Sequence, residues 1–152
     1  MQLVFASPAR NLPGALAPDP ERLRRLIPLA GARVRAGFPS PADDYVERRL
    51  DLHEWLIRHE AATFFWKVRG GSMRGAGIHD GDVLVVDRAV SPVSDDIVLV
   101  TVEGAVIVKF YMKRGELVWL EEAAPERRRL ALRDGQEAVV WGVVVGMVRR
   151  FR

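Results

Sequence analysis

The chain has 152 residues and contains no cysteine. This absence excludes a disulfide framework, a cysteine nucleophile and any metal site built from thiolates.

Histidine is scarce as well, and the three histidines (His53, His59 and His79) do not fall at the spacing of a zinc motif. We therefore expect no metal ion and no other cofactor.

Long apolar runs are also absent. No stretch approaches the roughly 20 apolar residues that a membrane-spanning helix needs. The first thirty residues carry arginines and prolines that interrupt every apolar stretch, and no positive cluster precedes one, so they do not resemble a signal peptide. We expect a cytoplasmic protein with no membrane partner.

What the chain does contain is typical of one folded domain with an additional arm. Hydrophobic residues make up 49% and charged residues 28%, a balance that favours a globular protein over a disordered one. The length suffices for one domain with a real core and is too short for two.

The charge is unevenly distributed. Residues 1–36 hold six arginines, Asp19 and Glu21, which give a net charge of +4. Because the whole chain has a net charge of +3, residues 37–152 carry a net charge of −1. A basic arm on a nearly neutral body is suited to contact nucleic acid or an acidic protein face. The same arginines would equally serve to keep an exposed arm in solution, and the sequence leaves both interpretations open.

The first 42 residues are rich in proline, at positions 8, 13, 18, 20, 28, 39 and 41. Prolines at this density exclude long helices and central strands, so we expect residues 1–42 to form an extended arm. A short helix is predicted at Glu21–Ile27, directly after Pro20.

Residues 43–152 are predicted to form a mainly β domain with one short helix. Asp51 is placed to cap a helix over Leu52–Arg58, with Glu54 in capping-box register. Turn pairs such as Glu103-Gly104 separate runs rich in Val, Ile, Phe and Trp. Seven short strands would form a rolled sheet or a partly open barrel; they are Thr63–Arg69, Val83–Asp87, Ile97–Val102, Ala105–Tyr111, Glu116–Glu121, Arg128–Leu132 and Ala138–Val148.

Ser72 follows a predicted strand in the sequence Gly70-Gly71-Ser72-Met73. Two glycines allow the backbone to turn sharply and to bring amide N–H groups close to a reacting carbonyl group. An ordinary turn serine has the same local sequence, and this tetrapeptide alone favours that simpler interpretation.

Lys109 lies in an apolar strand and shares one face with Ile107 and Tyr111. A lysine among apolar neighbours loses hydration, which lowers its pKa, and a neutral amine can act as a general base. The alternative is a lysine at a sheet edge whose ammonium group reaches water. Spacing alone does not connect Lys109 with Ser72.

A resemblance to a known family connects them. The stretch Gly37–Leu52 is similar to UmuD-type proteins, the self-cleaving subunits of DNA-damage-induced polymerases. Four shorter motifs extend the resemblance, and the serine and lysine motifs among them are shared with LexA and phage repressors; they are Gly70–Met73, Gly77–Asp82, Val108-Lys109 and Gly142–Val144.

The resemblance implies a self-cleavage reaction. Ser72 would be the nucleophile, Lys109 the base that takes its proton, and Ala36-Gly37 the bond that is cut, which leaves residues 37–152 as the active product. The candidates for stabilising the oxyanion are the backbone amides of Gly71, Ser72 and Met73, and the sequence leaves open which of them act. The best-known members have cysteine in place of Ala36 and aspartate in place of Gly71, and neither difference removes a reacting group.

The resemblance also implies partners. These are a second copy of the chain in a homodimer, a RecA–single-stranded-DNA filament that promotes cleavage, and a UmuC-type Y-family polymerase that the cut form assists in translesion synthesis during the SOS response.

Three other functions fit less well. A LexA-type repressor needs a helix-turn-helix, and the proline-rich residues 1–36 are too short for one, so sequence-specific binding to duplex DNA is not expected. A signal-peptidase-like enzyme would need a membrane anchor. An interaction module that is never cut stays open as an alternative.

Overall fold

The computed structural model describes residues 2–5, 26–30, 46–123, 126–131 and 135–151. The chain divides into two compact units, one formed by Met1–Pro18 with His59–Arg152 and the other by Asp19–Arg58. The predicted boundary between an arm and a domain, at residues 42 and 43, lies outside the described residues. Within the described part, no helix has both the length and the apolar character needed to cross a bilayer.

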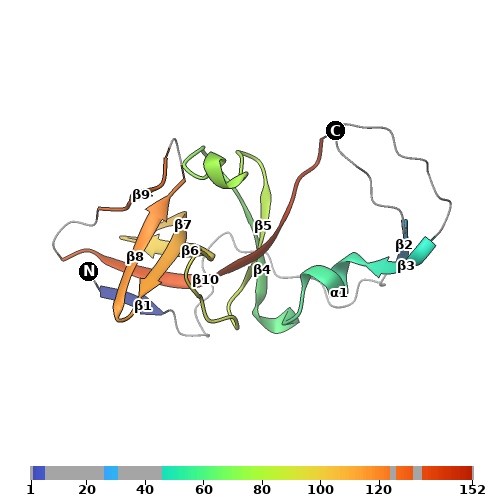
Figure 1. Cartoon of the computed structure of the whole chain (residues 1–152), viewed down its shortest axis with the longest axis horizontal. Helices are drawn as coiled ribbons and strands as arrows, with labels where there is room; N and C mark the ends of the chain where they lie inside the picture. The colour runs from blue at the N-terminus through green and yellow to red at the C-terminus, as the bar shows by residue number, and fades with distance from the viewer. Residues whose placement is uncertain (1, 6–25, 31–45, 124–125, 132–134, 152) are drawn as a thin grey trace. The chain divides into compact units, whose positions relative to one another are not determined.

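The larger unit contains an eight-stranded sheet (Figure 1). β4 and β9 form the ends of the strand order, and they do not pair with each other in the described part of the chain, so the sheet stays open. This agrees with the predicted mainly β fold. In spatial order the strands are β4 (Thr63–Lys67), β5 (Val83–Asp87), β10 (Glu137–Val148), β6 (Ile97–Val102), β7 (Ala105–Arg114), β8 (Leu117–Glu122) and β9 (Arg128–Arg129), and β1 (Gln2–Phe5) pairs in parallel with β10.

β10 lies at the centre of this sheet. Its first half, Ala138–Val143, pairs with β6, and its second half, Val143–Val148, pairs with β5. The register shifts at Gly142, where an added Cβ would lie 2.8 Å from a methyl group of Val86. The apolar first part of β10 is covered on both edges, by β6 and by β1, whereas in the described residues Val144–Val148 pairs with β5 alone.

The turn between β6 and β7 has the predicted two-residue form. Val102 pairs with Ala105, and the two residues between them, Glu103 and Gly104, have φ angles of +49° and +82°. Positive φ at both positions is the requirement of a type I′ turn, whose twist matches that of the flanking strands.

The second unit holds a hairpin and the predicted helix. β2 (Leu26–Ala30) pairs antiparallel with β3 (Val46–Asp51), which leads into α1 (Leu52–Leu56). The Asp51 carboxylate caps α1 by accepting hydrogen bonds from the amides of His53 and Glu54, at 2.9 and 3.2 Å.

The sequence-based prediction fails at three strands, β1 of the larger unit and β2 and β3 of the second unit. The helix predicted at Glu21–Ile27 is wrong at Leu26 and Ile27, which belong to β2, and residues 21–25 lie outside the described residues. β1 and β3 were not predicted. Pro28 does not prevent β2 because a two-stranded hairpin has only edge strands, where a missing N–H is tolerated.

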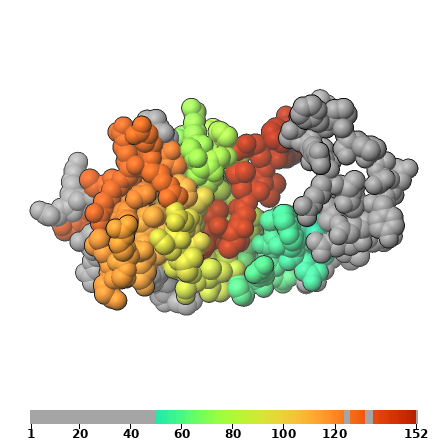
Figure 2. Space-filling view, viewed as in Figure 1, coloured from blue at the N-terminus to red at the C-terminus, as the bar shows by residue number. Residues whose placement is uncertain are grey.

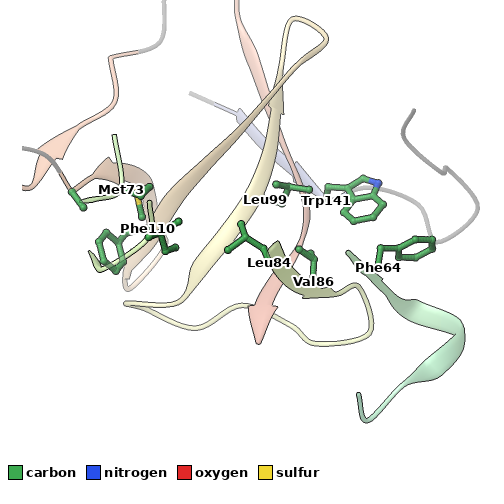
Figure 3. Close-up of a cluster of buried hydrophobic side chains, with 9 residues drawn as sticks. Phe64, Met73, Leu84, Val86, Leu99, Phe110 and Trp141 are labelled. Atoms are coloured by element: carbon green, nitrogen blue, oxygen red, sulfur yellow. The ribbon is translucent and has the colours of Figure 1, made fainter. Parts of the chain in front are cut away.

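The sheet buries apolar side chains in two clusters, because alternate residues of each strand face opposite sides. Leu99 belongs to the first cluster, whereas its neighbours Val98 and Val100 belong to the second. Figure 3 shows the first cluster, in which Trp141 meets Phe64 edge-on at 5.2 Å between ring centroids. Its members are Phe64, Met73, Ile78, Leu84, Val86, Leu99, Phe110, Ala123 and Trp141.

Candidate active site

The first core cluster fixes the backbone beside both residues of the predicted dyad. Met73, the residue after Ser72, and Phe110, the residue after Lys109, are both buried members of that cluster. They lie at the same end of it in Figure 3. Burial of these two neighbours holds Ser72 and Lys109 in place, although the two dyad residues are 37 positions apart in sequence.

Ser72 lies on a closed loop between β4 and β5. At its base, the Val68 amide donates to the Asp82 carbonyl oxygen at 2.8 Å, and the Gly81 amide donates to the Val68 carbonyl oxygen at 3.0 Å. Gly70, with φ of +89°, turns the chain and donates its amide to the Asp80 carboxylate at 2.8 Å. These hydrogen bonds fix the shape of the loop, and the Ser72 side chain is exposed on it.

A buried carboxylate anchors the far side of this loop. Asp82, which is 2% exposed, accepts hydrogen bonds from the His79 amide at 2.7 Å and from two nitrogens of Arg149 at 2.6 Å each. Arg149 also donates to the Gly77 carbonyl oxygen at 2.7 Å. The hydrogen bond from Arg149 lowers the pKa of Asp82 from 3.8 to about 2, so this carboxylate stays charged at neutral pH.

The structure brings Lys109 to Ser72. The Lys109 Nζ donates a hydrogen bond to the Ser72 Oγ at 3.2 Å. Lys109 is only 5% exposed and lies on β7, between β6 and β8, so the sheet-edge alternative is wrong. Burial lowers the pKa of Lys109, because an ammonium group loses solvation in the interior. The amine is therefore easier to deprotonate than that of an exposed lysine.

A third side chain at this site, the carboxylate of Glu122, was not predicted from the sequence. The Glu122 Oε2 lies 3.7 Å from the Lys109 Nζ, and Glu122 acts against burial by raising the pKa of Lys109. Burial is the larger of the two effects. No local pattern marked Glu122, because the contact joins two different strands.

The residue after Glu122 holds the loop itself. The Ala123 amide donates to the Ser72 carbonyl oxygen at 3.0 Å. Gly75, in the short 3-10 helix η2 (Arg74–Ala76), lies so close to this segment that an added Cβ would be 2.0 Å from the Ala123 carbonyl oxygen. A second 3-10 helix, η1 (Glu60–Ala62), precedes β4.

We expect Gly75→Ala to slow self-cleavage at least about tenfold. The added methyl group would collide with backbone, which cannot rotate away as a side chain can, so the loop must shift and carry Ser72 away from Lys109. The rate is followed by gel electrophoresis of purified protein. Gly104→Ala, which strains a positive φ in the β6–β7 turn, is the control for a general loss of stability.

The remaining predicted residues are distributed as follows. Ala36 and Gly37 lie outside the described residues, whereas Gly71 and Met73 flank Ser72 on the loop. His59 contacts the Asp87 carboxylate at 2.6 Å, and no group of three metal-ligating side chains occurs in the described part of the chain.

Comparisons with known proteins identify the family. Residues 28–145 match the family model described as Peptidase S24-like. Protein SamA of Salmonella typhimurium is 38% identical over 137 residues, which cover 90% of this chain and 95% of SamA. Protein ImpA of Escherichia coli is 42% identical over 127 residues, covering 82% and 85%, and Protein MucA of the same organism is 38% identical over 118 residues, covering 78% and 81%.

An open β sheet that carries a serine beside a buried lysine is the arrangement of a serine–lysine peptidase domain. The chain belongs to the S24-like peptidase family, in its UmuD-like group of self-cleaving serine peptidases.

Proposed function

We propose that the chain cuts its own backbone once, between Ala36 and Gly37, with Ser72 as the nucleophile and Lys109 as the general base. The observation that carries this proposal is the 3.2 Å contact between the Lys109 Nζ and the Ser72 Oγ, combined with the burial of Lys109. A nucleophile and a base within hydrogen-bond distance are the minimum requirement for this chemistry.

The reaction proceeds in two stages, acylation of Ser72 and hydrolysis of the acyl group. The neutral Lys109 amine takes the Ser72 hydroxyl proton as the Oγ attacks the Ala36 carbonyl carbon, and amides of the Gly71–Met73 segment stabilise the oxyanion. When the Ala36–Gly37 bond breaks, Lys109 returns the proton to the Gly37 nitrogen. Water then hydrolyses the acyl group on Ser72 by the same proton transfers, and releases residues 1–36.

Attachment of the substrate to the enzyme favours this reaction. When both belong to one molecule, the attack gains from a high effective concentration and needs little binding affinity for a free peptide. An enzyme of this kind acts once on its own chain, which makes cleavage a switch from the full-length protein to residues 37–152.

The cut form acts as accessory subunit of a UmuC-type Y-family polymerase in translesion synthesis, and a RecA–single-stranded-DNA filament stimulates the cut. The membership of the UmuD-like group supports both partners. The arm carries a net charge of +4 against −1 for residues 37–152, so its removal changes the surface that a cytoplasmic partner meets.

The C-terminal part of β10, beyond its pairing with β6, supports a homodimer. β6 pairs with β10 only as far as Val143, whereas β5 continues to Val148. In this last part of the chain Val145, Met147 and Val148 are exposed, and Phe151 is 90% exposed. Figure 2 shows this C-terminal segment at the surface, in red. An apolar segment with an open strand edge is suited to pair with a second copy.

The arm should block the polymerase function until it is removed. A docked arm competes with a partner at an effective concentration that can be about millimolar for a short tether. We expect residues 37–152 to support bypass of a damaged template base, and uncleaved Ser72→Ala protein to support little or none. The measurement is primer extension with the polymerase at matched concentrations. Equal activity of the two forms would favour an interaction module whose arm is passive.

A further inference from the structure

Glu122 is the charged side chain that contacts Lys109 in this site. Its Oε2 lies 3.7 Å from the Lys109 Nζ, and the same nitrogen donates a hydrogen bond to the Ser72 Oγ at 3.2 Å. The Glu122 side chain is 34% exposed, whereas that of Lys109 is 6% exposed. The pair therefore lies at the boundary between the interior and solvent, where a carboxylate can change its partner without a change in the core.

Among the residues that the structure describes, Glu122 is the one ion-pair partner of Lys109. The backbone partner of Lys109 on β6 is Val98, and the loop contributes the neutral Ser72 hydroxyl group. Glu121, the neighbour of Glu122, accepts a hydrogen bond from the Trp119 indole nitrogen at 2.6 Å and does not contact Lys109. On β9, Arg128 is the backbone partner of Glu122 and is exposed.

An ion pair with Glu122 requires the ammonium form of Lys109, whereas base catalysis requires the neutral amine. The ammonium form is the one that Glu122 attracts, and it can donate to the Ser72 Oγ but cannot accept a proton from it. Only the neutral amine starts the reaction. Every interaction that favours the ammonium form therefore delays cleavage.

We propose that Glu122 is a positioning residue that favours the ammonium form of Lys109 through their 3.7 Å contact and thereby raises the pH at which self-cleavage begins. The inference rests on the proposed roles of Ser72 and Lys109. Glu122 restrains the reaction, so a change that moves its carboxylate away from Lys109 accelerates cleavage. This identifies the Glu122–Lys109 contact as a point at which cleavage is regulated.

The first test compares rates of self-cleavage from pH 6 to pH 11. The wild-type rate should rise with pH and reach a plateau when Lys109 is neutral. Glu122→Gln removes the charge and keeps the shape, so it should cleave roughly three- to tenfold faster at pH 7 to 8 and equally fast on the plateau. Glu121→Gln is the matched control and should follow the wild-type profile.

Two results would overturn the inference. If Glu122→Gln has the wild-type profile, the contact has no effect on the base. If it lowers the plateau and leaves the midpoint unchanged, Glu122 only supports the structure. Glu122→Asp, which keeps the charge, should fall between the wild type and Glu122→Gln in its midpoint.

A second measurement does not depend on cleavage. The chain has only three lysines, and Lys67 and Lys113 are exposed, so carbon-13 NMR of labelled lysine side chains gives two internal references. In uncut Ser72→Ala protein, Glu122→Gln should move the Lys109 titration to lower pH. An unchanged titration refutes the inference even if cleavage proceeds as proposed. A wild-type protein that never cleaves, with a shifted titration, refutes only the proposed function.

Discussion

Ser72→Ala should reduce the rate of self-cleavage at least about 1,000-fold, and Lys109→Ala should do the same. The first change removes the atom that attacks, and the second removes the group that takes its proton. Because the two residues act as one unit, the double variant should be no slower than either single variant. Loss of intact chain is measured by gel electrophoresis at pH 9 to 10.

This experiment needs two controls: a variant of a serine outside the site, and a check that the dyad variants are folded. Ser91→Ala, at an exposed position, should cleave at the wild-type rate. Circular dichroism should show that the dyad variants stay folded. Cleavage of Ser72→Ala protein at the wild-type rate, in a preparation free of other proteases, would refute the assignment.

Asp82→Ala should lower the free energy of unfolding by about 2–4 kcal/mol, the largest effect on stability among the site residues. The change leaves the His79 amide and the Arg149 guanidinium group without the carboxylate that both contact. It also releases the loop that carries Ser72. Urea denaturation measures the loss, and Asp96→Ala, which removes one exposed hydrogen bond to the Val93 amide, should cost less than about 1 kcal/mol. Equal losses for the two variants would contradict this account.

The same carboxylate should make stability depend on acid pH. The pKa of Asp82 is about 2 in the folded chain against 3.8 as the ordinary value. A lowered pKa stabilises the folded state above the unfolded pKa, and this stabilisation is lost as the pH falls from about 4 toward 2. In Asp82→Ala protein this part of the acid dependence should disappear.

Seven of the eight strands in the sheet of the larger unit, all except β1, could be predicted, because their information is local. Alternating β-branched residues and turn pairs such as Glu103-Gly104 determine where strands begin and end, and the cap at Asp51 determines where α1 begins. β2 and β3 could not be predicted in this way. Their stability comes from pairing with each other across residues 31–45, and this pairing outweighs the unfavourable proline in β2.

The candidate site was only partly accessible to sequence reasoning. The apolar strand context of Lys109 indicated a lowered pKa, but only the family resemblance connected it with Ser72. Glu122 was missed, as was the contact between Asp82 and Arg149, which joins residues 67 positions apart. Such contacts arise when strands distant in sequence become neighbours in a sheet, and no local period records them.

The most direct test of the central proposal is the mass of the products. Purified wild-type protein is incubated alone at pH 10, and a second sample is incubated with a RecA–single-stranded-DNA filament at neutral pH. Intact masses are then determined by mass spectrometry. The account predicts two fragments in both samples, residues 1–36 and residues 37–152, and only full-length chain in the Ser72→Ala sample. A cut at another bond, or no cut in either wild-type sample, would contradict it.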